Sequence, residues 1–163
     1  MTMARSVREH LDQAGIDYDV LQHAHSDSSR QTAHRAHVAP AQLAKAILTR
    51  DDNDYLLCVI PADYKLVFSW LNGAMHSSYQ LASESELCYF FDDCEIGAVP
   101  ALGQAYGCKV IWDERLADQK DIFLESGDHE NLVHVDQCGF MALMGDQEHV
   151  TISCPDYEAA EFC

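Results

Sequence analysis

The chain has 163 residues, 48% of them hydrophobic, which is enough for one domain with a single core. Its 27 acidic and 10 basic residues give a formal net charge of −17, which argues against a general affinity for nucleic acid. No apolar run reaches the roughly 18 residues of a membrane span. Met1–Glu9 lacks the apolar stretch of a secretory signal. We therefore expect a cytoplasmic protein with no membrane partner.

Hydrophobic periodicity and capping residues predict the elements of the first part of the chain. They are a helix over 6–14 ended by Gly15, a short strand over 18–21, a helix over 29–36 opened by Ser28-x-x-Gln31, and a helical turn from Pro40. Apolar strands over 44–50 and 55–60 flank four polar residues, which predicts a β-hairpin.

The second part of the chain mixes short helices and strands. We expect a break at 61–63, a helix over 66–71 ended by Asn72-Gly73, an extended stretch over 79–81, a helix opened by the capping box Ser83-x-x-Glu86, a loop over 97–103, strands over 109–113, 121–125 and 132–135, and a helix over 136–143.

This irregular mixture predicts an α+β (mixed α/β) fold with a central, mixed and partly antiparallel sheet flanked by helices. The domain is expected to span residues 1–150. Residues 151–163 are expected to form an acidic tail or linker, because they are polar from Pro155 onward.

The seven cysteines form no C-x-x-C pair, and most lie in apolar stretches. They are expected to be buried free thiols in a reducing compartment. The nine histidines are scattered and form no H-E-x-x-H motif. The sequence therefore predicts neither a metal site nor a cofactor.

Lys45 interrupts the apolar run Leu43-Ala44-Lys45-Ala46-Ile47-Leu48. A buried ammonium group without a partner costs several kcal/mol or lowers its pKa. Such a charge is tolerable where it serves a pocket that receives an anion or a developing oxyanion. The alternative is a lysine whose head group reaches water at the edge of a strand.

A second feature is the loop Gly97-Ala98-Val99-Pro100-Ala101-Leu102-Gly103, in which two glycines flank a proline. Glycine permits close backbone approach and proline fixes the shape of a loop. Exposed backbone N–H groups in such a loop can bind a carbonyl or an oxyanion. The same pattern also occurs in ordinary turns.

The succession of motifs resembles the YbaK/prolyl-tRNA-synthetase-associated editing domain family over about residues 20–145. The motifs are Thr32-Ala33, the Lys45 run, Cys58-Val59-Ile60-Pro61-Ala62-Asp63, Leu81-Ala82-Ser83-Glu84-Ser85-Glu86-Leu87, the Gly97–Gly103 loop and Val110-Ile111-Trp112-Asp113.

The resemblance implies hydrolysis of the ester that joins a wrong, small amino acid to the 3′ end of a tRNA, with tRNA(Pro)-type substrates favoured. Lys45 falls on the functional lysine of the family. The substrate-binding positions implied by the resemblance are Gly97, Ala98, Val99, Pro100, Ala101, Asp113, Ser126, Gly127 and His129. Ala101 replaces the final proline of the family's glycine-x-x-x-proline loop.

Two hypotheses follow. The first is a trans-acting aminoacyl-tRNA deacylase whose partner is the 3′ end of a mischarged tRNA, with a synthetase or a downstream domain as a further partner. The second is a non-catalytic module that binds a small ligand, a nucleotide or a protein partner within a regulatory protein. Residues 1–50 carry a net charge of +1 and residues 51–163 carry −18, and this acidity favours the second hypothesis.

Overall fold

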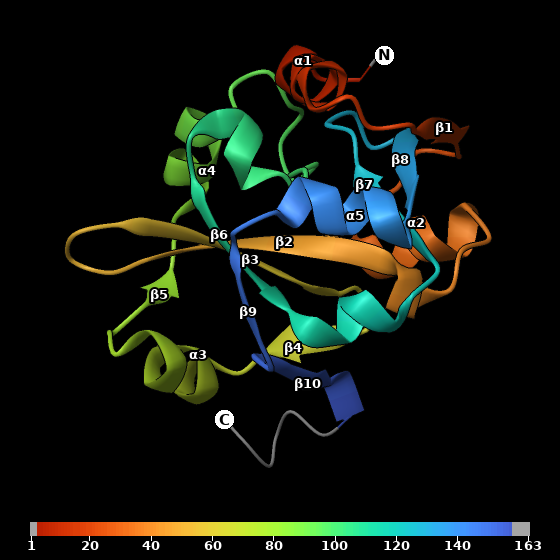
Figure 1. Cartoon of the computed structure of the whole chain (residues 1–163). Helices are drawn as coiled ribbons and strands as arrows, with labels where there is room; N and C mark the ends of the chain where they lie inside the picture. Colours follow the sequence, from red (N-terminus) through yellow and green to blue (C-terminus); the bar gives the residue numbers. More distant parts are fainter. Residues whose placement is uncertain (1–2, 158–163) are drawn as a thin grey trace.

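The structure is a computed structural model that describes residues 3–157 (Figure 1). Its helices are α1 (Arg5–Ala14), α2 (Ser29–Arg35), α3 (Phe68–Met75), α4 (Glu84–Phe90) and α5 (Gln137–Met144), with 3-10 turns η1 (Pro40–Gln42), η2 (Gly103–Tyr106) and η3 (Glu114–Asp118). Its strands are β1 (Asp19–Gln22), β2 (Leu43–Arg50), β3 (Tyr55–Pro61), β4 (Tyr64–Leu66), β5 (Gln80–Leu81), β6 (Lys109–Asp113), β7 (Asp121–Glu125), β8 (Asn131–Asp136), β9 (Glu148–Val150) and β10 (Ser153–Pro155).

The main sheet is mixed, which confirms the predicted fold class. Its strand order is β1-β8-β7-β2-β3-β6-β9, and β5 adds to β2. The contacts of β1 with β8, β8 with β7 and β2 with β3 are antiparallel. Those of β7 with β2, β3 with β6 and β6 with β9 are parallel. A second sheet consists of β10 and β4.

Strand β2 changes neighbours along its length. Leu43 and Ala44 pair with β7, whereas Thr49 and Arg50 pair with β5. Within the described residues, 45–48 pair with β3 alone, although the Leu48 carbonyl also accepts a hydrogen bond from Ala82 N–H. One edge of β2 is therefore open beside Lys45.

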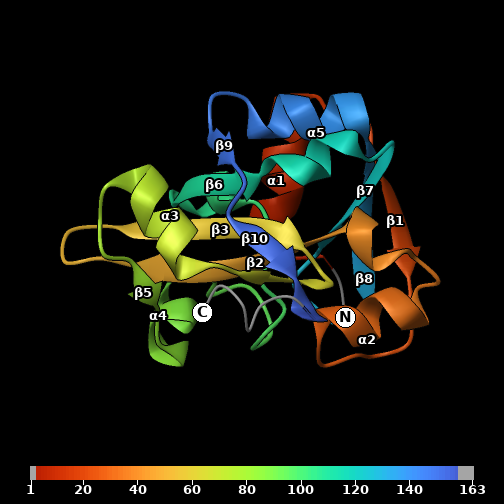
Figure 2. The same cartoon turned by 90° about the horizontal axis from the view of Figure 1, so that it is seen from below.

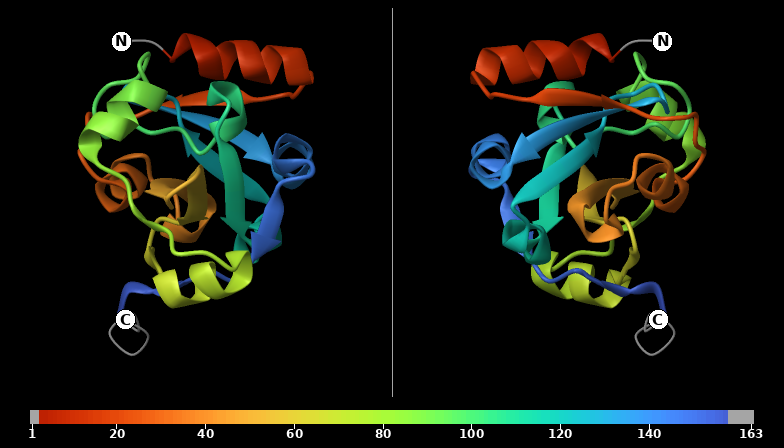
Figure 3. Two further views of the ribbon diagram at one scale, coloured as in Figure 1. Left: turned by 90° about the vertical axis from the view of Figure 1, so that its left-hand side faces the viewer. Right: turned by 90° about the vertical axis from the view of Figure 1, so that its right-hand side faces the viewer.

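Side-chain alternation gives the sheet two buried faces. Ala44 and Leu48 face a large core that also contains Phe140 of α5. Leu43 faces the opposite side and packs in a smaller cluster with Ala33 of α2. Figure 2 shows α5 and α2 on opposite sides of the β2–β3 hairpin, as this alternation requires. Figure 3 shows α1 across one end of the sheet and α3 at the other.

Local sequence signals located most elements correctly. The β2–β3 hairpin and strands β6 and β7 form as predicted. Gly15 ends α1 with a φ of 66°, a left-handed conformation that glycine adopts without strain. Ser83 and Glu86 form the complete predicted capping box of α4.

The helix predicted over 66–71 forms, but its ends differ from the prediction. Residues Tyr64–Leu66 form β4, and α3 begins at Phe68 and continues through Asn72-Gly73 to Met75. The Asn72 side chain bonds the backbone N–H and carbonyl of Tyr79, and a Cβ at Gly73 would meet no atom within 4 Å. Asn72 therefore holds the Tyr79 backbone against the helix, and Gly73 faces open space. Neither residue ends the helix.

The expected tail also begins later than predicted. Ser153–Pro155 pair with β4, and Asp156 N–H donates to the Asp63 carbonyl. The pairing partner of β10 lies about 90 residues earlier in the chain, so no local pattern indicated this strand. Residues 158–163 of the expected tail lie outside the described residues.

Two further expectations concern cysteines and membranes. Cys58 and Cys108 are buried free thiols, as predicted, and Cys154 is buried, but Cys88 and Cys138 are exposed on helices. Cys163 lies outside the described residues. Within residues 3–157, no helix combines the length and apolar character that a membrane crossing requires.

Candidate active site

Lys45 is half-buried near the start of β2, and its ammonium group is held by backbone oxygens. Nζ donates to the Tyr64 carbonyl at 2.8 Å and to the Ala62 carbonyl at 3.4 Å. Since an ammonium has three N–H groups, these two bonds leave one for a ligand. Both carbonyls belong to the turn from β3 into β4, so the ammonium group lies at that turn.

Charged groups from distant parts of the chain surround Lys45. Burial is the main cause that lowers the pKa of Lys45, while Asp156 and Asp63 raise it and Arg30 and Lys65 lower it. Arg30 of α2 forms an ion pair with Asp156. Lys45 therefore lies where α2, the β3–β4 turn and the end of β10 meet.

The Gly97 loop is a compact turn with one exposed residue at its tip. Gly97 has a φ of +82°, and Ala98 N–H donates to the Glu95 carbonyl at 3.0 Å. Ala98, Pro100 and Ala101 are buried, and Val99 is partly buried. Ala101 packs in the main core, so the residue that replaces the family's proline serves packing here.

The turn between β7 and β8 holds this loop in place. Glu95 N–H donates to the Gly127 carbonyl at 2.8 Å. Gly127 has a φ of +109°, and a Cβ there would lie 2.9 Å from Ala4 Cβ and 3.0 Å from Cys94 Sγ. Only glycine fits this crowded, left-handed position.

Asp128 organises the same turn. Its carboxylate accepts hydrogen bonds from the backbone N–H groups of Glu130 and Asn131, from Asn131 Nδ2 and from Ser126 Oγ. Burial opposes ionisation, but these bonds outweigh it and hold the pKa of Asp128 below its ordinary value. Ser126 also donates to the Asn131 carbonyl, so both side chains are occupied within the turn.

His129 connects the turn directly to the Gly97 loop. Its Nε2 bonds the Ile96 carbonyl at 2.6 Å, and a Cβ on Gly97 would lie 3.6 Å from its Cε1. His129 also has a φ of +63°, an uncommon value for a residue other than glycine. The ring of His25 lies 5.2 Å from that of His129, so the segment before α2 contacts the same group.

Glu125, the last residue of β7, points to the same face of the sheet as Lys45. Leu43 and Ala44 pair with Phe123 and Leu124, so the next residue on each strand projects in the same direction. Burial raises the pKa of Glu125 to about 7, Asp128 also raises it, and His129 opposes the rise. Within the described residues its Oε1 is buried without a hydrogen-bond partner.

Asp113 lies on the same face, two strands away from Lys45 and one strand beyond Ile60. Its Oδ2 accepts bonds from Ile152 N–H, Ser153 N–H and Ser153 Oγ, and its Oδ1 accepts one from Arg115 N–H. These four bonds fasten β10 and η3 to the sheet. They leave Asp113 little capacity to bind a substrate.

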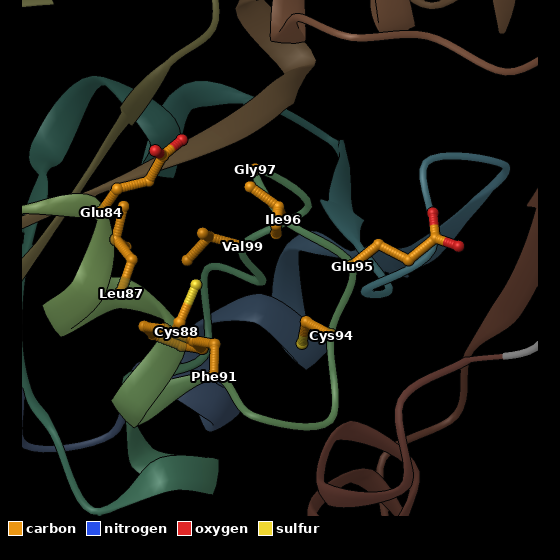
Figure 4. Close-up of a pocket in the computed structure, with 9 residues that line it drawn as sticks. All are labelled: Glu84, Leu87, Cys88, Phe91, Cys94, Glu95, Ile96, Gly97 and Val99. Carbon is orange, nitrogen blue, oxygen red and sulfur yellow. The ribbon is translucent and has the colours of Figure 1, made fainter.

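A small pocket opens between α4 and the Gly97 loop (Figure 4). Leu87 and Cys88 of α4 face Val99 across it, whereas the Glu95 side chain points away from them. The pocket has about 50 Å³ of free space. A water occupies roughly 30 Å³ in the liquid, so this volume suits a short side chain and not a nucleoside.

The structure thus brings Gly97, Ser126, Gly127 and His129 together, places Lys45 on the face of the sheet that Glu125 also faces, and adds residues that the sequence analysis missed. They are Arg30, Glu125, Asp128 and Asp156. An isolated acid among 27 gives no sequence signal. Asp128 is the exception, since the run Ser126-Gly127-Asp128-His129 has the composition of a side-chain-bonded turn.

No cluster of three or more His, Cys, Asp or Glu side chains in residues 3–157 could hold a metal ion. The groups at this site are instead lysine, arginine and histidine side chains, backbone N–H groups and the carboxylates of Asp63, Glu125, Asp128 and Asp156. Such a set can position an ester and stabilise an oxyanion.

Comparison with solved structures supports the fold. One neighbour, described as "a putative trans-editing enzyme for prolyl tRNA synthetase", superposes with a TM-score of 0.81 at 17% identity, over 93% of this chain and 96% of that chain. A hypothetical protein superposes equally well at 17% identity, over 92% of this chain and all of the other. Identities this low establish the fold alone.

A third neighbour is described as "a Putative signal transduction protein" from Marinobacter aquaeolei VT8. It superposes with a TM-score of 0.76 at 15% identity, over 91% of this chain but only 30% of that chain. No curated protein matches this chain. The aminoacyl-tRNA editing domain family, however, matches residues 23–143, well over half of the sequence. The chain therefore belongs to the aminoacyl-tRNA editing domain family.

Proposed function

We propose that this protein is a trans-acting deacylase that hydrolyses the ester between a small amino acid and the 3′ end of a mischarged tRNA. The observation that carries the proposal is Lys45, whose two hydrogen bonds leave one N–H for a ligand, on the face of the sheet that Glu125 also faces. We expect the protein to act in the cytoplasm, where its tRNA partners and their synthetases are.

The charges around Lys45 fit an RNA end. Arg30 and Lys65 lie close enough to Lys45 to lower its pKa. Three of the chain's ten basic residues thus gather at this site in a protein of net charge −17. Asp63 and Asp156 lie among them, so three cations and two acids leave a net charge of +1, and this local excess of positive charge attracts phosphate although the rest of the surface is acidic.

We assign complementary roles to the other groups. Lys45 binds the terminal nucleotide or stabilises the developing oxyanion. The Gly97 loop, held by His129, positions the aminoacyl group through its backbone. Since an aminoacyl ester is already activated, a positioned water or the substrate's own 2′-OH together with fixed dipoles suffices for hydrolysis.

The pocket beside Gly97 suggests a small amino acid. Its free space of about 50 Å³ accepts a short side chain and excludes a long or aromatic one. Binding alone lets a synthetase discriminate between small apolar side chains only about 10- to 200-fold. A pocket that excludes large side chains would let this protein remove the small amino acids that a synthetase attaches by mistake. Alanine, cysteine and serine esters of tRNA(Pro) are therefore the first substrates to test.

The decisive experiment measures deacylation of Ala-, Cys- and Ser-tRNA(Pro) by the wild type and by Lys45→Ala. We expect the substitution to reduce the rate about a hundredfold or more, as loss of an oxyanion-stabilising group typically does. Lys109→Ala is the control because it removes an exposed lysine of β6, outside the group of charges around Lys45. A wild type that hydrolyses none of these esters, or a Lys45→Ala variant as active as the wild type, contradicts the proposal.

A second candidate is a non-catalytic binding module. The acidity of residues 51–163 favours it, as does the likeness to one part of a protein described as a signal transduction protein. The two candidates differ in tRNA binding at low salt. An editing domain should bind tRNA in a manner weakened by added salt and by Lys45→Ala, whereas the module should bind no tRNA.

A further inference from the structure

Three carboxylate oxygens of the described structure are buried without a hydrogen-bond partner on or beside the Lys45 face. They belong to Asp63, Glu125 and Asp156. Asp63 and Asp156 lie near the positive charge of Lys45, and Asp156 also pairs with Arg30. Cations therefore balance these two groups, but no lysine or arginine acts on Glu125.

Glu125 adjoins the turn that holds the Gly97 loop. It follows Leu124, which pairs with Ala44, so it lies on the same face of the sheet as Lys45. The backbone N–H of His129, four residues later, donates to the Glu125 carboxylate. The ring of His129 bonds the Ile96 carbonyl beside the Gly97 loop. Lys45 donates to the Ala62 and Tyr64 carbonyls and is not among the groups that act on Glu125.

A buried acceptor without a partner is costly, so a retained one indicates a donor that arrives with the ligand. Every aminoacyl ester carries such a donor in its α-amino group. As an ammonium it offers a positive charge and three N–H groups, which suit a carboxylate oxygen with no partner.

We propose that Glu125 binds the α-ammonium group of the aminoacyl ester and thereby selects substrates whose amino group is free. This inference rests on the proposed function, because it requires an aminoacyl ester in the site. Glu125 then fixes the amino end of the substrate, while the Gly97 loop lies at its ester and Lys45 at its nucleotide.

The test compares Ala-tRNA(Pro) with N-acetyl-Ala-tRNA(Pro), which has the same ester and side chain but no ammonium. We expect the wild type to prefer the free amine by about 10- to 100-fold in kcat/KM, the range of one charge-assisted hydrogen bond. Glu125→Gln keeps the shape of the side chain, and it should lower kcat/KM for Ala-tRNA(Pro) by a similar factor while leaving the acetylated substrate unchanged. Glu125→Ser should behave in the same way.

Asp121→Asn is the matched control. Asp121 lies on the same face of the same strand, but its carboxylate already bonds His134 at 2.8 Å. This variant should keep the wild-type preference, and thermal unfolding should show that all variants are folded.

The alternatives give different results. If Glu125 were a general base, Glu125→Gln would slow both substrates equally, which would overturn the inference and leave the deacylase function intact. A wild-type preference that survives in Glu125→Gln also overturns it. If the wild type hydrolyses neither substrate nor any other ester of the panel, the deacylase proposal itself fails, and the role of Glu125 fails with it.

Discussion

The two carboxylates that flank Lys45 across the sheet have opposite environments. Asp113 lies two strands away and accepts four hydrogen bonds, whereas Glu125 lies on the adjacent strand with one oxygen that has no partner among the described residues. Resemblance to the editing family drew attention to Asp113 and gave no role to Glu125. The hydrogen bonds instead favour a ligand at Glu125, and we propose a structural role for Asp113. A satisfied buried carboxylate supports the fold, and an unsatisfied one indicates a ligand.

Removal of the satisfied carboxylate should have the largest effect. Asp113→Ala leaves the N–H groups of Ile152 and Ser153 without their acceptor and releases β10, so we expect a loss of about 4 kcal/mol in the free energy of unfolding. Urea denaturation measures this quantity. Glu114→Gln, a change at the exposed neighbouring acid, should stay within about 0.5 kcal/mol of the wild type.

Unchanged stability in Asp113→Ala combined with lost deacylation would contradict the structural role. It would restore Asp113 to the substrate-binding set that the family resemblance implies.

The unsatisfied carboxylate of Glu125 should make the stability of the folded protein depend on pH. Burial raises the pKa of Glu125 from 4.5 to about 7. Between these two pH values the folded protein therefore keeps a proton on Glu125 that the unfolded chain has released. The contribution of Glu125 to the free energy of unfolding is therefore fully present below about pH 4.5. It is lost as the pH rises through 7, by at most about 3 kcal/mol. Asp128 and His129 are the neighbouring charged or titratable groups that act on it.

Glu125→Gln should remove this dependence. We expect the variant to gain stability over the wild type as the pH rises from 5 to 8, measured by urea denaturation at each pH. Asp121→Asn, on the same strand, is the control. Its difference in stability from the wild type should not increase in this way as the pH rises from 5 to 8. A variant that loses stability at pH 8 would show that ionised Glu125 is already satisfied in the free protein.

The same contrast explains what the sequence could predict. The hairpin of β2 and β3 carries its signal locally, in two apolar runs and the polar turn between them, and it formed as expected. Lys45 was evident because one cation stands out in an apolar run. Strands β4 and β10 have only three residues each and are held by partners far apart in the chain, so neither had a local signal.

The roles of the acids depend on the same long-range information. Asp113 is satisfied by residues 152 and 153, about 40 positions later in the chain. Glu125 is unsatisfied because Lys45, on the strand beside it, donates elsewhere. Neither fact can be inferred from the residue type or its immediate neighbours, since both follow from how strands pair.

The smallest effect on stability, and the sharpest test of the site, concerns the bond between His129 and the Ile96 carbonyl. His129→Asn removes the ring but keeps a residue that tolerates the left-handed conformation, so we expect a cost of about 1 kcal/mol. His129→Ala should cost more, because it adds backbone strain at a φ of +63°. Urea denaturation distinguishes the two.

Deacylation by His129→Asn then tests whether the Gly97 loop must be held in place. Since His129 fixes the loop while Glu125 holds the amino group, we expect a lower rate on both free and N-acetylated Ala-tRNA(Pro), with the preference between them retained. Loss of the preference would mean that His129, and not Glu125, recognises the ammonium. Unchanged rates on both substrates would mean that Gly97 keeps its position through the Glu95–Gly127 backbone bond alone.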